Sequence, residues 1–316
     1  MKFSIVKDLI CINHSSKQHN LKLDQFLSDG NDCREGFLAC EECGIHFPII
    51  NGVPIIVRNF DSYIQERTRI LGDWILKTST SQMRNFLREK VKTVDPKLTT
   101  NNKYEFSSQY YNSYLWTHYD YRDNDRFLSM FKYRIKPDEI YSKVIQGLEV
   151  NVTGKSLDLG CALGASSLNL AKKVAFSYGV DLSYSFITEA RRRAAGTSNI
   201  EYLVCDIADL PFKPLSFDVV MALNILDRTD FDKAFLSLDR CIISGGELVI
   251  TDPYDSSSDS KTLNSINLRL FLEKKGYQIR KKTQRESYIP WIVRINERAY
   301  LFYFADYIYA VKLSSH

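Results

Sequence analysis

The sequence predicts an α/β protein with a Rossmann-like, mainly parallel sheet in its C-terminal half, a small N-terminal Cys/His module and a helical segment between them. From about residue 149, short apolar runs such as SLDL and FDVVMAL alternate with helical stretches such as SFITEARRRA. This alternation is typical of a doubly wound parallel sheet. Four of the seven cysteines lie within the first 43 residues. We therefore expect three parts, residues 1–60, 61–148 and 149–316.

Length and composition limit the function classes. The chain has 316 residues, a formal net charge of +4 and 44% hydrophobic residues, which is ordinary globular composition. No stretch approaches the roughly 18 consecutive apolar residues of a membrane span, and the N-terminus lacks the pattern of a signal peptide. We expect a cytoplasmic protein without membrane contact. The basic runs at 191–193 and 280–282 are short and fit solvated surfaces, so nucleic acid is not an expected partner.

The N-terminal part carries two metal-binding knuckles. Cys11-x-x-His14 and Cys40-x-x-Cys43 are separated by 25 residues, which suits a closed, structural, four-ligand Zn²⁺ site. Two apolar runs around Asn51-Gly52 predict a hairpin. The stretch CGIHFPIINGVPII resembles the zinc ribbon of the small activator subunits of tRNA and protein methyltransferases. That family usually has Cys where this chain has His14, so Cys33 or His19 are alternative fourth ligands.

The middle part, residues 61–148, combines polar helical stretches such as SQMRNFLREKV with the aromatic-dense segment YEFSSQYYNSYLWTHYDYRD. This part shows little of the alternating apolar pattern that predicts strands. We expect a helical linker that acts as a lid over the edge of the sheet.

A glycine-containing loop opens the C-terminal part. The sequence LDLGCALG at 157–164 follows a predicted strand and precedes a helix. Gly160 permits a tight turn and close approach of a ligand, and Gly164 permits close packing of the helix on the sheet. The next strand ends about twenty residues later in Asp181, a position suited to ribose hydroxyls, and the third strand ends in Asp206. Ligands bind at this edge of such sheets.

The motifs LDLGCALG, GVDLS, CDIADLPF and FDVVMALN resemble those of class I S-adenosylmethionine-dependent methyltransferases, over roughly residues 150–251. The resemblance implies a seven-stranded methyltransferase sheet, S-adenosylmethionine as cofactor and transferase activity. Asp158 and Gly160 would border its methionine moiety, Asp181 would hold the ribose, and Asp206 with Ile207 would face the adenine. The predicted cofactor-binding set is completed by Cys161, Gly164, Leu182 and Asn224. Ala162 departs from the family, which often has glycine there, and the loop lacks the GxGxxG spacing of NAD-binding proteins.

Three segments near the predicted site suggest the methyl acceptor. They are NILDR at 224–228, TDPY at 251–254 and PWIVRINER at 290–298. The last of these segments lies between two expected strands, at 277–285 and 304–312. Together the three segments resemble the histidine imidazole-N methyltransferases, chiefly the methyltransferase domain of the ovothiol-synthesis enzyme and the protein-histidine methyltransferases. YLWTHY at 114–119 is similar to a stretch that precedes that domain. The candidate catalytic residues are therefore Asn224, Asp227, Tyr254, Arg294, Arg298 and His118.

These residues have chemical roles that fit an imidazole acceptor. Asn224 or Asp227 accepts a hydrogen bond from the ring N–H, so that the lone pair of the other nitrogen faces the methyl group. Arg294 and Arg298 form a clamp on a substrate carboxylate. Each residue also has a structural alternative: strand-end and helix caps for Asn224 and Asp227, surface ion pairs for the arginines, and aromatic packing for His118 and Tyr254.

The sequence thus predicts a methyltransferase that acts on the imidazole nitrogen of a histidine-derived metabolite or of a histidine-containing peptide or protein. An RNA-base methyltransferase is one alternative. A non-catalytic methyltransferase-like module that activates a partner is another. The size of the acceptor, the nitrogen that reacts and the oligomeric state do not follow from the sequence.

Overall fold

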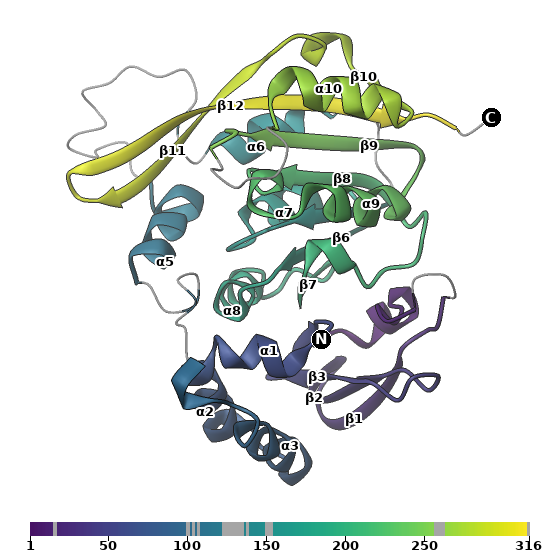
Figure 1. The fold of residues 1–316 in the computed structure, drawn as a ribbon, viewed down its shortest axis with the longest axis vertical. Coiled ribbons are helices and arrows are strands. Elements are labelled where there is room, and N and C mark those ends of the chain that lie inside the picture. The colour runs from purple at the N-terminus through teal and green to yellow at the C-terminus, as the bar shows by residue number, and fades with distance from the viewer. Residues whose placement is uncertain are drawn as a thin grey trace.

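Strands from all parts of the chain except the middle segment build the molecule around one sheet (Figure 1). The computed structural model describes residues 1–14, 18–98, 102, 105, 108–121, 136, 139–148, 154–255 and 263–314. Its strands are β1 (Lys22–Asp29), β2 (Asp32–Ala39), β3 (His46–Ile50), β4 (Val53–Ile56), β5 (Lys155–Leu159), β6 (Phe176–Asp181), β7 (Ile200–Cys205), β8 (Phe217–Leu223), β9 (Ile242–Asp252), β10 (Tyr277–Ile279), β11 (Tyr288–Asn296) and β12 (Ala299–Lys312).

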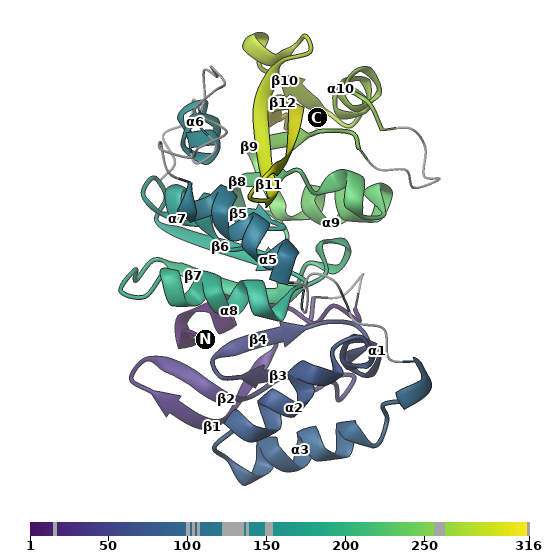
Figure 2. The same cartoon turned by 90° about the vertical axis from the view of Figure 1, so that its left-hand side faces the viewer.

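The helices flank this sheet (Figures 1 and 2). The α-helices are α1 (Phe60–Gln65), α2 (Thr68–Lys77), α3 (Ser81–Val91), α5 (Ser108–Leu115), α6 (Ile140–Gln146), α7 (Ala165–Ala171), α8 (Tyr184–Arg193), α9 (Phe231–Cys241) and α10 (Ser265–Lys274). Short 3-10 turns cover Phe3–Asp8, Pro96–Leu98, Ile207–Asp209, Leu226–Arg228 and Lys281–Thr283, and a π-helical turn covers Trp116–Asp120. No described helix is long and apolar enough to cross a bilayer.

The C-terminal half forms the predicted Rossmann-like sheet of seven strands, in the order β7-β6-β5-β8-β9-β12-β10. Strands β5 to β9 run parallel, whereas β12 is antiparallel to β9 and to β10. All six residues of β7 are buried, because a sheet covered on both faces needs nearly continuous apolar strands. The helices start at side-chain caps: Ser183 accepts from the Phe186 N–H and Asp230 from the Lys233 N–H. The predicted fold class is confirmed.

The C-terminal strands differ in length from the prediction. The strand expected over residues 277–285 ends at Ile279, because the chain turns into the 3-10 helix Lys281–Thr283. The last strand begins earlier than expected, at Ala299, and forms a long hairpin with β11. The segment 290–298 therefore belongs mostly to a strand that projects beyond the end of the sheet (Figure 1).

The N-terminal module is joined directly to this sheet. Its predicted hairpin is present: β3 and β4 are antiparallel around Asn51 and Gly52, whose φ angles of 52° and 82° suit a tight hairpin turn. β4 then pairs in parallel with β7, with Ile55 opposite Val204. Leu9, Phe47 and Phe212 share one buried cluster with the sheet. The ribbon and the sheet thus have a common core as well as a common hydrogen-bonded ladder.

The middle segment is helical over its described residues and divides between two places. Helices α1, α2 and α3 lie beside the ribbon strands (Figure 2), where Trp74, Met83 and Leu87 are buried in one cluster. Helix α5 and the π-helical turn lie against β11: the Thr117 hydroxyl donates to the carbonyl oxygen of Ile292 at 3.2 Å. The boundary predicted at residue 149 lies outside the described residues.

Candidate functional site

A cavity of about 530 Å³ opens where the parallel strands end. Its walls come from the loops after β5, β6, β7 and β8, from helix α5 with the π-helical turn, from α6 and from β11. Seven of the residues predicted to bind cofactor line it, namely Gly160, Cys161, Asp181, Leu182, Asp206, Ile207 and Asn224. The fold therefore brings together side chains from four consecutive strand ends, as expected for a ligand site in a parallel sheet.

The loop after β5 is shaped by left-handed backbone conformations. Gly160 has φ 64°, and a Cβ atom placed on it would lie 2.7 Å from Cγ1 of Ile225. Ala162 also has a positive φ, 45°, and its N–H donates to Oδ2 of Asp181 at 3.0 Å. This bond ties the loop to the end of β6 and accounts for the unusual backbone at a non-glycine residue. The alanine that departs from the family pattern thus still adopts the conformation that glycine favours.

Asp158 and Gly164 are not among the residues that line the cavity. The Asp158 carboxylate is buried and accepts hydrogen bonds from the hydroxyls of Ser166 and Ser167 at 2.6 and 2.5 Å. Burial raises the pKa of Asp158 to about 6, although the two hydroxyls oppose this rise. Asp158 therefore holds the start of α7 against the sheet from behind the loop.

The acidic residues at the ends of β6 and β7 are held by backbone donors. Asp181 accepts from the N–H groups of Ala162 and Ser183 at 3.0 and 2.9 Å. Burial raises the pKa of Asp181 to about 6, and the nearby charge of Glu105 adds to the rise. Asp206 accepts from the Ala208 N–H at 2.9 Å. Both side chains are thereby fixed in position at the cavity wall.

Asn224 and Asp227 follow β8 at another part of the cavity. Asn224 lines it with φ 54°, and its Oδ1 accepts from the Thr251 hydroxyl at 2.9 Å. Asp227 is buried and does not line the cavity; its Oδ2 accepts from the Asp255 N–H at 3.3 Å. Burial raises the pKa of Asp227, against the effect of Arg228. Arg228, which the sequence predicted only as part of the NILDR segment, does line the cavity, and its Nε lies 3.4 Å from Oδ1 of Asp227.

His118 lies in the π-helical turn, a rare element that is often found at functional sites. It lines the cavity although it is only 8% exposed, and its Nδ1 has no hydrogen-bond partner among the described residues. Its ring centroid lies 4.7 Å from that of Tyr141. Burial, with a further contribution from the charge of Arg193, lowers the pKa of His118 to about 3. The imidazole of His118 is therefore neutral at physiological pH.

The remaining predicted residues lie away from the cavity wall. Tyr254 donates from its hydroxyl to Oδ2 of Asp306 at 3.0 Å. Arg294 lies near the end of β11, where its Nε donates to the carbonyl oxygen of Asn296 at 3.4 Å, and Arg298 is exposed just beyond that strand. Trp291, from the same segment, does line the cavity. A strand sends alternate side chains to opposite faces, so Trp291 and Arg294, three positions apart on β11, lie on opposite faces of that strand.

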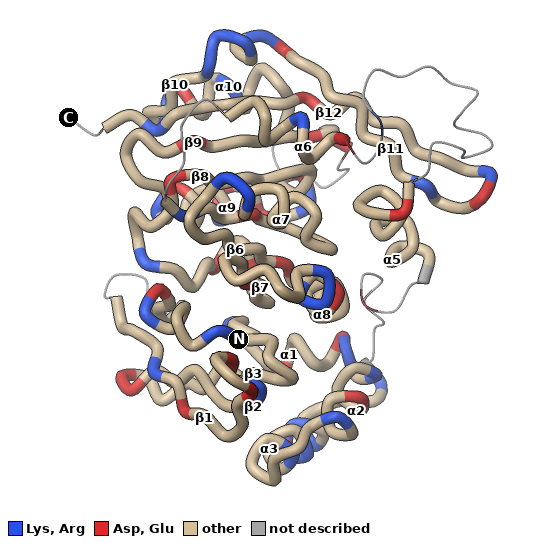
Figure 3. The backbone as a smooth tube through the Cα atoms, turned by 180° about the vertical axis from the view of Figure 1, so that it is seen from behind, with Lys and Arg blue, Asp and Glu red and all other residues tan. Residues whose placement is uncertain are grey.

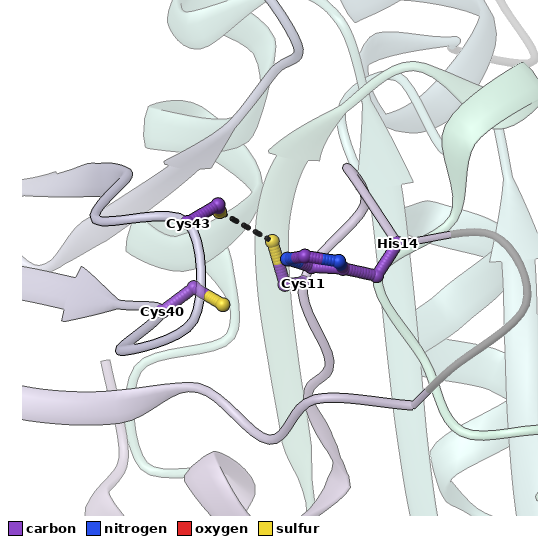
Figure 4. Close-up of side chains that lie close together, drawn as sticks. All are labelled: Cys11, His14, Cys40 and Cys43. Atoms are coloured by element: carbon purple, nitrogen blue, oxygen red, sulfur yellow. Dashed lines mark hydrogen bonds between the residues drawn. The ribbon is translucent and has the colours of Figure 1, made fainter.

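The Cys/His module forms a separate cluster (Figure 4). One ligand atom from each of Cys11, His14, Cys40 and Cys43 lies within 4.8 Å of the other three. The sulfur atoms of Cys11 and Cys43 are 3.7 Å apart, and tetrahedral Zn²⁺ with bonds of about 2.3 Å would place two sulfurs about 3.8 Å apart. Nε2 of His14 is buried without a hydrogen-bond partner among the described residues.

The two alternative ligands lie outside this cluster. The Cys33 thiol lies in the buried core and donates to the carbonyl oxygen of Glu35 at 3.4 Å. His19 packs its ring against His14, with centroids 4.4 Å apart. The described residues thus bring together the four predicted zinc ligands, Cys11, His14, Cys40 and Cys43. Two thiols come from the second knuckle, and one thiol and one imidazole come from the first.

Comparisons with known proteins show similarity in the C-terminal half of the chain. Residues 157–250 match the family model described as a methyltransferase domain. Demethylmenaquinone methyltransferase of Clavibacter sepedonicus is 34% identical over 97 residues, which is 30% of this chain and 40% of that protein. Phosphoethanolamine N-methyltransferase of Plasmodium falciparum is 27% identical over 118 residues, which is 36% of this chain and 44% of that protein. The chain spans less than half the length of these relatives.

The crystal structure of a SAM-dependent methyltransferase from Aquifex aeolicus aligns with 55% of this chain and 90% of its own, at 17% identity and a TM-score of 0.42.

Proposed function

Because residues 157–250 match the family model described as a methyltransferase domain, we propose that the chain is an S-adenosylmethionine-dependent N-methyltransferase whose acceptor is an imidazole nitrogen. The acceptor would be a histidine-derived metabolite or a histidine in a peptide or protein. One observation carries the proposal: a single cavity is lined by the carboxylates Asp181 and Asp206 and by Asn224, with the buried Asp227 close behind. This places groups suited to a nucleoside and groups suited to an imidazole around the same space.

The donor would occupy the part of the cavity nearest the glycine loop. S-adenosylmethionine supplies an electrophilic methyl group on a positively charged sulfur. Asp181 suits the ribose hydroxyls, and Asp206 with Ile207 suits the adenine. A side chain at Gly160 would collide with Ile225, so the glycine keeps the loop after β5 packed closely against the residues after β8. The cavity volume of about 530 Å³ falls in the range of roughly 300 to 1,000 Å³ that is usual for small-molecule sites.

The acceptor chemistry follows from the groups around Asn224. A neutral imidazole has one nitrogen with a free lone pair and one that carries hydrogen. Oδ1 of Asn224 accepts from Thr251, but a carbonyl oxygen has a second lone pair that can accept the ring N–H. The lone pair of the other nitrogen would then face the methyl group. The carboxylate of Asp227 would stabilise the imidazolium that forms.

His118 contributes by its lack of charge. A protonated histidine in the cavity wall would repel both the sulfonium of the donor and the imidazolium of the product. Burial holds the pKa of His118 at about 3, so its neutral ring adds a polar but uncharged surface. We propose that His118 orients the acceptor through its Nδ1.

We further propose that Cys11, His14, Cys40 and Cys43 bind one structural Zn²⁺. Four protein ligands close the coordination sphere, and a closed site contributes folding free energy. None of the four lines the cavity at the strand ends. The ribbon would therefore act by stabilising β4 and, through it, the edge strand β7 of the parallel sheet.

A labelling experiment tests the proposed activity. The purified protein is incubated with S-adenosylmethionine that carries an isotope-labelled methyl group and with histidine, histidine-containing peptides, phosphoethanolamine or bulk tRNA, and the products are located by mass spectrometry. We expect label on an imidazole nitrogen. Label on RNA would instead support a nucleic-acid methyltransferase, and donor binding without any labelled product would support a non-catalytic module.

Variants connect this activity with the cavity. Asn224→Ala and Asp227→Ala are expected to lower turnover by at least about 100-fold while the affinity for the donor changes little. Asp73→Asn, on the exposed surface of α2, is the matched control and should retain activity. Full turnover in both the Asn224 and Asp227 variants would exclude the imidazole site.

Basic and acidic residues are interspersed along the chain, and lysine and arginine occur on α3, on α8 and in the segment after β10 (Figure 3). A broad single-sign stripe is the feature expected beside a nucleic-acid site. The mixed pattern supports the proposal of a small-molecule or peptide acceptor, and the tRNA sample in the panel tests it directly.

A further inference from the structure

One end of the cavity is built by Arg228 and Trp291, which come from distant parts of the chain. Arg228 follows β8, and Trp291 lies in β11. Asp255 and Tyr303 connect them: Oδ2 of Asp255 lies 3.4 Å from a terminal nitrogen of Arg228 and accepts from the Tyr303 hydroxyl at 3.1 Å. The ring of Tyr303 in turn stacks on Trp291, with centroids 5.1 Å apart and an angle of 29°. The two side chains are therefore held in one connected unit.

This end carries charges of both signs. Arg228 lies 3.4 Å from a carboxylate oxygen of Asp227 and 3.4 Å from one of Asp255. These distances are longer than the 2.7–2.9 Å of strong charge-assisted hydrogen bonds. A guanidinium has five N–H donors, so a carboxylate that enters the cavity can bind Arg228 while the two aspartates keep it in place.

Arg67 also lines the cavity, but its role differs. Its side chain is only 3% exposed, its Nε donates to Glu105 at 3.0 Å, and its guanidinium packs over the ring of Tyr63 at 3.9 Å. Glu105 in turn accepts from the N–H groups of Tyr184 and Ser185 at the start of α8. Arg67 thus belongs to the packing of the middle segment on α8.

We infer that Arg228 determines acceptor specificity by binding a carboxylate of the acceptor, whose ring packs against Trp291. The acceptor class is a small imidazole amino acid, with its carboxylate on Arg228 and its ring beside Trp291, two residues that line the cavity. This inference rests on the proposed function. It assigns the carboxylate contact to Arg228, in place of the predicted clamp by Arg294 and Arg298, because neither of those residues lines the cavity.

A comparison of acceptors tests the inference. kcat/KM is measured for histidine, for histamine, which lacks the carboxylate, and for a peptide with an internal histidine, with the wild-type protein and with Arg228→Gln. The wild type should prefer histidine over histamine by about 10-fold to 100-fold, as expected for a hydrogen bond to a charged group. Arg228→Gln should remove most of this preference by lowering kcat/KM for histidine alone. Arg88→Gln, exposed on α3, is the matched control and should keep the preference.

The outcomes separate the inference from the proposed function. If the wild type methylates no imidazole, the proposed function fails and the inference fails with it. If imidazoles are methylated but the ratio of histidine to histamine is the same in Arg228→Gln, only the inference is refuted. A wild-type preference for the internal peptide would also refute it. Donor affinity, measured by titration calorimetry, should be equal in all three proteins and shows that Arg228→Gln is folded.

Discussion

Replacing Gly164 with alanine tests whether the loop between β5 and α7 depends on the absence of a side chain. Gly164 has φ 81°, and a Cβ atom on it would lie 2.5 Å from the hydroxyl oxygen of Tyr202 and 2.9 Å from Cβ of Ala190. Tyr202 also donates from this hydroxyl to the carbonyl oxygen of Gly164 at 3.1 Å. The new methyl group must therefore displace a buried ring that the loop itself helps to hold.

The structure allows the free-energy change to be divided into parts. A left-handed backbone costs an alanine about 1–2 kcal/mol, and the smaller entropy of the unfolded chain offsets about 0.4–1 kcal/mol of this. Overpacking against Tyr202 and Ala190 adds about 1–3 kcal/mol, and loss of the Tyr202 hydrogen bond adds about 1 kcal/mol. We expect Gly164→Ala to lower the free energy of unfolding by about 2–6 kcal/mol.

Gly196→Ala is the matched control. Gly196 has nearly the same φ, 88°, but no atom lies within 4 Å of a Cβ placed on it. Only the cost of the left-handed backbone and the smaller entropy of the unfolded chain apply there, so we expect Gly196→Ala to lower the free energy of unfolding by about 1 kcal/mol. Urea unfolding followed by circular dichroism gives both free energies. Equal losses in the two variants would show that the contact with Tyr202 does not limit the residue at position 164, and the packing argument would be refuted.

Two further predictions concern the metal and the donor. Cys40→Ser should lose the bound zinc, as measured by elemental analysis, and should lower the thermal midpoint of unfolding. Cys33→Ala should retain one zinc per chain. Zinc retained in the first variant, or lost in the second, would contradict the assigned ligand set. The pKa of Asp181 is raised to about 6, so its carboxylate becomes protonated as the pH falls through 6, and calorimetry should show donor affinity falling by about tenfold between pH 7.5 and pH 5. Asp181→Asn should bind the donor weakly with a flat pH profile, and a steep profile in that variant would assign the titration to another group.

Much of the cavity wall could be predicted from the sequence because it is formed by residues close together in the chain. A strand, a glycine loop and a helix in direct succession place Gly160 and Cys161 at the sheet edge, and parallel strands bring the residues after their carboxyl ends, such as Asp181 and Asp206, to the same edge. The two halves of the Cys/His cluster could also be predicted, because each pair of ligands is separated by only two residues in the sequence. Even so, Asp158 lies behind the loop and not at the cavity, because its carboxylate is held by Ser166 and Ser167.

The sequence by itself determined the alternation of strands and helices, the acidic strand ends and the two metal-binding knuckles, since each depends on residues close together in the chain. The tertiary structure alone decided which of the later residues reach the cavity. Arg228 and Trp291 meet there because β11 folds back on β12, whereas Arg294 and Arg298 lie farther along the same hairpin, beyond the cavity wall. It also decided that β4 of the ribbon joins β7. The pairing of β4 with β7 connects residues about 150 positions apart, such as Ile55 and Val204, and local spacing contains no information about it.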